Sequence, residues 1–93
     1  MPDYAAHYAQ TEQQIKELLG TMIHSVTGAE LGEVNEFLTA REYGLALETI
    51  ARLLMDRHGL IQPDIVKRVD SLAESMHLTD ADFAREFRIH AGR

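Results

Sequence analysis

The chain has 93 residues, a length that suits one domain with a hydrophobic core of its own. It contains no cysteine, which excludes thiolate catalysis, cysteine-based zinc sites and disulfide frameworks. Its net charge of −6 comes from residues 1–48, where eight acidic residues accompany two basic ones, whereas residues 49–93 hold seven of each. Such a field repels nucleic acid and attracts a basic partner, although acidic residues also serve solubility.

The first two predicted helices cover residues 11–26 and 29–38, where apolar residues recur with the helical period. Thr11 followed by Gln14 has the form of a capping box, which predicts that the first helix begins at Thr11. Thr27 and Gly28 then break the chain. The residues of the second helix that should turn toward the core are Leu31, Val34 and Leu38.

The third predicted helix covers residues 40–58. Thr39 and Glu42 have capping-box form, so Thr39 is the predicted N-cap, although the same carboxylate can also meet a partner. Gly44 follows within the first two turns, and a glycine in a helix interior costs about 0.5–1 kcal/mol relative to alanine. With Ala51 on the same stripe, Gly44 predicts the close approach of a neighbouring helix or of the amino-terminal segment. The predicted core residues of this helix are Tyr43, Ala46, Leu47, Ile50, Leu53 and Leu54.

The fourth and fifth predicted helices follow Gly59, a good helix terminator. Pro63 fits the first turn of the fourth helix, where its missing N–H costs nothing. Thr79 with Asp82 is the predicted cap of the shorter fifth helix. The predicted core residues of the fourth helix are Ile65, Val66, Val69, Leu72, Ala73 and Met76, and those of the fifth are Phe83, Phe87 and Ile89.

Short connections predict that successive helices pack as antiparallel neighbours. We therefore expect an all-α fold, a compact bundle of four to five short helices with up-down connections. Residues 1–93 should form a single helical domain, in which residues 1–10 and 90–93 are expected to be loosely ordered.

Enzyme motifs are missing from the sequence, which has no glycine-rich phosphate loop, no HExxH and no Gly-x-Ser-x-Gly elbow. Glu74 and His77 make one ExxH step of the kind found in di-iron bundles, but such a site needs two steps and two further glutamates. We expect no catalytic residue, no metal and no cofactor. A small helical enzyme or metal protein built on Glu74 and His77 is the weakest alternative.

The sequence also lacks the marks of nucleic-acid or membrane association. The second and third helices are acidic, whereas a DNA-reading helix is basic; Arg85, Arg88 and Arg93 lie in the tail. No apolar run approaches the roughly 20 residues of a membrane span, and the amino terminus lacks a secretory signal pattern. We expect a cytoplasmic protein, favoured as a monomer, with no nucleic acid and no membrane as a partner.

The surface of the second helix is the first part of a predicted binding site. On a wheel of 100° per residue, Glu33 and Glu36 point away from the core, while Glu30 and Phe37 lie at one edge. An aromatic ring flanked by acids is typical of an interface anchor. In the alternative interpretation, Phe37 covers the core margin or packs against the fifth helix.

The third helix adds Leu45, an apolar residue on a polar face beside Glu48. A single exposed leucine is weak evidence, because such residues are common on protein surfaces. The complete predicted partner-binding site comprises Glu30, Glu33, Glu36, Phe37, Glu42, Leu45 and Glu48.

The segments EVNEFLTAREYGLALETIARLLMD and IQPDIVKRVDSLAESMHL resemble immunity proteins of bacterial competition systems, namely the MafI-like and contact-dependent growth inhibition (CdiI-type) families. The pattern that carries the resemblance is Glu42-Tyr43-Gly44-Leu45-Ala46-Leu47-Glu48, within a similarity that covers residues 30–78. The resemblance implies a protein that binds and blocks a cognate toxin, commonly a nuclease, inside the producing cell.

The charge distribution agrees with this implication. A nuclease must attract phosphates, so its active cleft is usually basic, and an acidic protein can fill or cover it. Charge complementarity raises the association rate, and a few desolvated anchors make the complex long-lived. We therefore predict an immunity protein whose partner is a basic toxin domain. The alternative is another helical binding module, such as an adaptor, a regulatory subunit or an antitoxin.

Overall fold

The helical periodicity of the sequence corresponds to five α-helices in the computed structural model, which describes residues 4–57 and 61–92. No strand occurs in these two ranges, and the predicted all-α bundle is confirmed. None of the helices described there is long and apolar enough to cross a membrane. The elements in chain order are α1 (Tyr4–Thr21), the 3₁₀ turn η1 (Ile23–Ser25), α2 (Gly28–Thr39), α3 (Tyr43–Arg57), α4 (Pro63–Ser75) and α5 (Asp82–Ala91).

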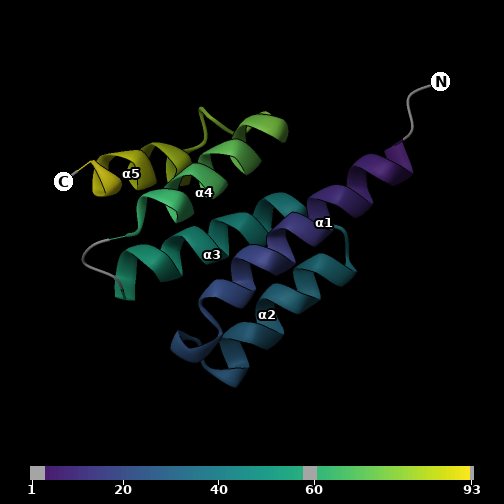
Figure 1. Ribbon diagram of the computed structural model, residues 1–93. Helices are drawn as coiled ribbons and strands as arrows, with labels where there is room; N and C mark the ends of the chain where they lie inside the picture. Colours follow the sequence, from purple (N-terminus) through teal and green to yellow (C-terminus); the bar gives the residue numbers. More distant parts are fainter. Residues whose placement is uncertain (1–3, 58–60, 93) are drawn as a thin grey trace.

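The helix α3 is the centre of the bundle and packs against all four other α-helices. Figure 1 shows α2 on one side of α3 and α5 on the other, with α1 crossing beside α2 and α4 beside α5. The helix α2 packs mainly on α3, whereas α1 contacts both α3 and α4. The acidic α2 is therefore an outer element of the bundle.

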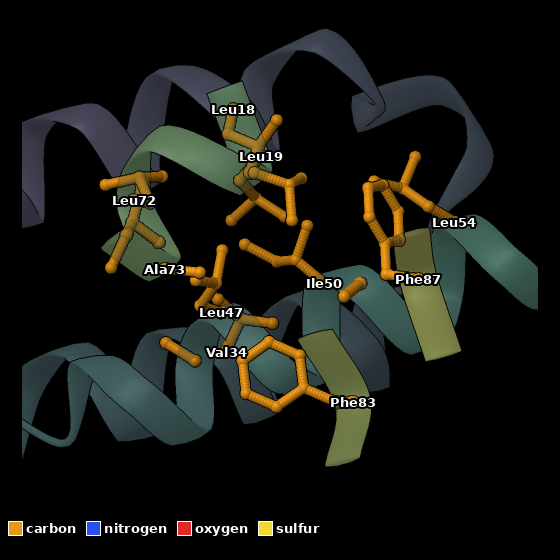
Figure 2. Packing of buried hydrophobic residues seen from close by; sticks show 14 of the residues in the cluster. Leu18, Leu19, Val34, Leu47, Ile50, Leu54, Leu72, Ala73, Phe83 and Phe87 are labelled. Carbon is orange, nitrogen blue, oxygen red and sulfur yellow. The ribbon is translucent and has the colours of Figure 1, made fainter. Parts of the chain in front are cut away.

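The core draws side chains from every α-helix, as Figure 2 shows. Burying a large aliphatic or aromatic side chain stabilises a fold by about 1.5–3 kcal/mol, so this cluster is the main source of stability. The predicted inward faces of α2, α3 and α4 are confirmed, with some of their residues only half-buried at the margin of the core. The largest fully buried side chains are Phe87, Ile15, Leu18, Leu47, Ile50, Val34 and Val69.

One predicted core residue, Ile89, is wrong: its side chain is 63% exposed. Phe83 and Phe87 are buried and lie one turn apart on α5. Ile89 follows Phe87 by two residues, a rotation of about 200° on a helix, which turns it away from the core.

The helix α1 begins at Tyr4, seven residues before the predicted start. Thr11 lies inside the helix and is buried, so the predicted capping box of Thr11 and Gln14 is wrong. The alanines in the stretch YAAHYAQ favour helix and carry it back past Thr11. The helix also ends earlier than predicted, at Thr21, and η1 follows.

The start of α2 holds a capping box that the sequence interpretation treated only as a break. Thr27 Oγ1 accepts a hydrogen bond from the Glu30 N–H at 3.1 Å, and Glu30 Oε1 accepts one from the Thr27 N–H at 2.8 Å. Two backbone donors at the helix start are satisfied in this way.

The end of α2 corrects the predicted cap of α3. Thr39 is the last residue of α2, and the chain reverses through Arg41, whose φ of 59° is left-handed. The Arg41 N–H donates to Leu38 O at 3.1 Å and the Glu42 N–H donates to Phe37 O at 2.8 Å, which is the Schellman pattern. Thr39 therefore closes one helix and does not cap the next.

The end of α4 repeats this turn with His77 at the left-handed position, where φ is 58°. The His77 N–H donates to Glu74 O at 3.1 Å, and the Leu78 N–H donates to Ala73 O at 2.7 Å. Glycine is the usual residue at such a position, yet an arginine and a histidine occupy the two turns of this protein.

The other predicted helix boundaries have mixed outcomes. Pro63 lies in the first turn of α4, as predicted. The predicted cap of Thr79 and Asp82 is wrong, because α5 begins after Ala81 without a side-chain cap. The predicted terminator Gly59 lies outside the described residues.

Candidate functional site

The contact between Gly44 and Leu78 is the structural centre of the candidate site. A Cβ placed on Gly44 would lie 3.2 Å from Leu78 Cδ1, closer than ordinary van der Waals contact. A neighbour does approach Gly44 closely, as predicted, but the predicted kind of neighbour is wrong. The neighbour is the side chain that follows the turn after α4, and not a helix or the amino-terminal segment.

Two surface depressions meet at this contact, since Gly44 and Leu78 line both. The first, which we call the Leu45 groove, has a volume of about 420 Å³ and runs past Leu45 and Glu48 to Asp82. The second, which we call the Arg41 depression, has a volume of about 680 Å³. Its lining includes Thr11, Arg41, Tyr43, Ser75 and His77.

The Leu45 groove contains two of the predicted site residues. Leu45 is 45% exposed, as the helical wheel predicts. Glu48 is ion-paired with Arg52, whose Nε and Nη2 lie 3.2 and 3.1 Å from Glu48 Oε2. Arg52 Nη1 also lies 3.1 Å from Glu86 Oε2, and these two carboxylates raise the pKa of Arg52 above its ordinary value. The three groups together keep one net negative charge beside the exposed leucine.

Glu30 has structural partners within the fold. Besides the capping box, its carboxylate pairs with Arg57 at the end of α3. The Thr27 N–H is the largest cause that lowers the pKa of Glu30, and the Thr27 hydroxyl and Arg57 lower it further. Arg57 also donates to Ser25 O at 2.7 Å, so it joins η1, α2 and α3. The spacing of Thr27 and Glu30 was a sequence signal for this role.

Glu33, Glu36 and Glu42 are exposed, and in the described ranges no cation lies within ion-pair distance of them. In that part of the chain, none of their three carboxylates accepts a hydrogen bond. We call these three residues the acidic surface. Glu42 accepts the first α3 hydrogen bond only through its backbone carbonyl, from the Ala46 N–H at 3.0 Å.

Phe37 is half-buried and packs against the core, in agreement with the interpretation that it covers the core margin. The seven predicted residues thus do not line one depression. Leu45 and Glu48 line the Leu45 groove, Glu30 and Phe37 have partners within the fold, and the acidic surface is open to solvent.

The Arg41 depression joins residues that sequence reasoning did not connect. It brings His7, Tyr8 and Thr11 of α1 next to the two left-handed residues, Arg41 and His77. These residues come from three distant segments, and no spacing pattern links them. The helical period of α1 could have predicted only that Thr11 is buried, because Thr11 lies four residues before Ile15 and so on the same face of the helix.

The ExxH pair offers no metal site that the structure supports. Glu74 and His77 are both exposed. Within residues 4–57 and 61–92, no three His, Asp or Glu side chains are grouped so that they could hold a metal ion.

Comparison with known proteins gave no match, whether with protein families, with curated sequences or with solved structures. Function therefore has to be inferred from the charges and contacts of the chain itself.

Proposed function

We propose that this protein is an immunity protein that binds and neutralises a basic toxin domain through its acidic surface and the adjoining Leu45 groove. The observation that carries the proposal is the set of exposed carboxylates at Glu33, Glu36 and Glu42, on the outer helix and the turn after it, which have no ion-pair partner among residues 4–57 and 61–92. The sequence resemblance to CdiI-type immunity proteins supports the same function.

The positions of these carboxylates oppose folding. Glu33 and Glu36 are three residues apart on α2, and such like-charged neighbours destabilise a helix by about 0.2–0.5 kcal/mol. Glu36 also lies in the last turn, where the helix dipole is negative and an anion is unfavourable by about 0.3–1 kcal/mol. The helix α2 contains no basic residue that offsets these charges. A basic partner would offset them on binding.

Leu45 supplies an apolar anchor within this charged region. It lies three residues after Glu42, which directly precedes α3, and three residues before Glu48 on α3, so a carboxylate lies about one turn to either side. An apolar side chain surrounded by charge combines a contact that loses its water on binding with charges that steer the approach. Colicin DNase–immunity pairs show how tightly an immunity protein can bind its toxin, with a Kd on the order of 10⁻¹³ M or below.

The proposed toxin is a nuclease domain, because an enzyme that cleaves nucleic acid presents a basic surface to phosphates. Inhibition needs only that this surface be covered, so the immunity protein needs no catalytic group. It would act in the cytoplasm of the producing cell, as a monomer that forms a one-to-one complex.

The direct test first asks whether the adjacent upstream gene encodes a large exported protein with a toxic carboxy-terminal domain, and then co-expresses that domain with this chain. We expect growth to be rescued, and the purified proteins to form a one-to-one complex at physiological salt. Growth arrest that continues while the folded protein is present in excess would refute the proposed function.

A further inference from the structure

The lining of the Arg41 depression differs in charge from the chain as a whole, whose net charge is −6. The chain has 15 acidic residues, yet among the described residues that line this depression there is no aspartate or glutamate. Its volume of about 680 Å³ lies within the range of small-molecule sites, about 300–1,000 Å³. Its walls come from α1, from the start of α3 and from the turns that follow α2 and α4.

Thr11 presents a buried hydroxyl to this depression. Its side chain is only 3% exposed, and its hydroxyl has no hydrogen-bond partner among the described residues. Two other helical threonines behave differently: Thr21 donates to Leu18 O at 2.6 Å and Thr49 donates to Leu45 O at 2.8 Å. Since buried hydroxyls are nearly always paired, a bound group with an acceptor atom is the natural partner of Thr11.

The start of α3 adds backbone donors. The first hydrogen bond of this 15-residue helix is the one from Ala46 N–H to Glu42 O. The N–H groups of Tyr43 and Gly44 precede it and have no acceptor in the part of the chain that the structure describes. Both residues line the depression, and unpaired amides at a helix start favour an anion.

Arg41 adds a positive charge beside these amides. It is exposed, and no carboxylate in the described ranges lies within ion-pair distance of it. Arg41 and His77 hold left-handed backbone angles that glycine adopts with less strain, and a glycine would present no side chain to the depression. A cationic side chain at the carboxyl end of a helix also stabilises the fold through the helix dipole, and Arg41 and His77 follow α2 and α4. A test must therefore measure ligand affinity and protein stability separately.

Aromatic rings form one wall of the depression. The ring centroids of His7 and Tyr8 are 6.0 Å apart, and those of Tyr8 and Tyr43 are also 6.0 Å apart. Tyr8 is 43% exposed, so its ring offers a face to a flat group. Aromatic rings favour offset-stacked or edge-to-face packing, and an exposed ring can form such a pair with the ring of a ligand.

From these observations we propose that the Arg41 depression binds a small organic anion, a carboxylate or phosphate carried on a planar ring. The oxyanion lies between the Arg41 guanidinium, the amides at the start of α3 and the Thr11 hydroxyl. The ring packs against Tyr8 and Tyr43. Glu42 of the acidic surface lies between Arg41 and Tyr43 in the sequence, but no residue of the acidic surface lines the depression. The proposal therefore does not rest on the proposed toxin binding.

The test titrates the ¹⁵N-labelled protein with phenyl phosphate, benzoate and phenol while the Gly44 amide is followed by NMR. We expect saturable shifts with the two anions at a Kd of about 1 mM or tighter, and at least about tenfold weaker binding of phenol. Arg41→Gln should weaken phenyl phosphate binding by about tenfold or more. Arg68→Gln, which removes another exposed and unpaired arginine, is the matched control and should leave binding unchanged.

Thr11→Val separates binding from folding, because valine has nearly the same shape without the hydroxyl. We expect weaker phenyl phosphate binding together with an unchanged or raised melting temperature. The proposal is overturned if neither anion gives a saturable shift at Gly44, if phenol binds as tightly as phenyl phosphate, or if Arg41→Gln and Arg68→Gln have equal effects. These measurements use the isolated protein, so they still test anion binding if co-expression with the toxin fails to rescue growth.

Discussion

The Leu45 groove and the Arg41 depression share the wall formed by Gly44 and Leu78, but their linings differ in charge. The groove has Glu48, Asp82, Arg52 and an exposed leucine, whereas the described lining of the depression has Arg41 and no acidic residue. A contact between one glycine and one leucine thus separates a surface suited to a basic protein from one suited to a small anion. The net charge of a chain therefore says little about each individual site on its surface.

Gly44→Leu should remove the separation between the groove and the depression, because the new side chain displaces Leu78 and opens the shared wall. Of the changes considered, it should lower the stability of the protein most. Overpacking of this kind typically costs about 1–3 kcal/mol of folding free energy. For a domain of this size each kcal/mol lowers the melting temperature by about 4–8 °C. Calorimetry of the purified variant measures the change.

The control for Gly44→Leu is Gly32→Ala on α2, where an added Cβ has open space around it. Alanine there should stabilise the protein by about 0.5–1 kcal/mol. Adding Leu78→Ala to Gly44→Leu should recover part of the loss, since it removes the clashing side chain. A normal melting temperature for Gly44→Leu alone would contradict the packing role of Gly44.

Charge reversal on the acidic surface should have the next largest effect. Glu33→Lys combined with Glu36→Lys should slow association with the toxin domain by about tenfold at low salt and weaken the salt dependence of the association rate. The fold should remain intact, and phenyl phosphate binding at the Arg41 depression should not change. Stopped-flow association kinetics over a range of salt concentrations supply the measurement.

Glu17→Lys combined with Glu74→Lys is the matched control, because it changes the net charge equally at exposed positions on α1 and α4. Its association rate should fall much less. If the control slows association and the α2 variant does not, the toxin interface lies on the side of α1 and α4, near Glu17 and Glu74.

Glu30→Gln tests whether Glu30 stabilises the fold while the acidic surface does not. We expect a smaller effect than that of the charge reversals. The pKa of Glu30 is lowered in the folded protein, so its carboxylate stabilises the fold fully above the unfolded pKa. That contribution is lost as the pH falls through the folded pKa. The variant should melt lower at neutral pH and approach the parent at acid pH, whereas Glu33→Gln should not melt lower at neutral pH. Thermal melts across this pH range provide the measurement.

Asp70→Asn should have the smallest effect and the opposite sign. Burial raises the pKa of this carboxyl, although Arg88 lowers it in part. The charged form therefore weakens the fold above the folded pKa, and the amide should melt slightly higher at neutral pH. The gain should disappear as the pH falls through the folded pKa, where Asp70 itself becomes neutral. An equal gain at every pH would contradict this account.

Helical periodicity predicted the buried faces because burial follows the geometry of the helix, as Val34, Leu47 and Leu72 illustrate. The same wheel predicted the exposed Leu45. Helix boundaries were less predictable, because a threonine with a partner three residues later can cap a helix, as Thr27 does, or close one, as Thr39 does. The difference depends on backbone angles that tertiary packing sets.

The candidate site was predictable only where it lies along one helix. The exposure of Glu33 and Glu36 follows from the period of α2. The capping role of Glu30 has a local signal in Thr27, but its ion pair needed the position of Arg57, which lies 27 residues away in the sequence. The Arg41 depression needed three separate segments to come together, and no local pattern encodes that meeting.

The bridge formed by Arg57 has a further consequence for recognition. The helix α2 packs mainly on α3, with the turn at Arg41 at one end of the pair and Arg57 joining Glu30 and Ser25 at the other. The two helices are thus fixed to each other at both ends, and the carboxylates between these ends keep their spacing before any partner arrives. A partner then pays little conformational entropy for ordering this surface, so more of the contact energy is available to lengthen the lifetime of the complex.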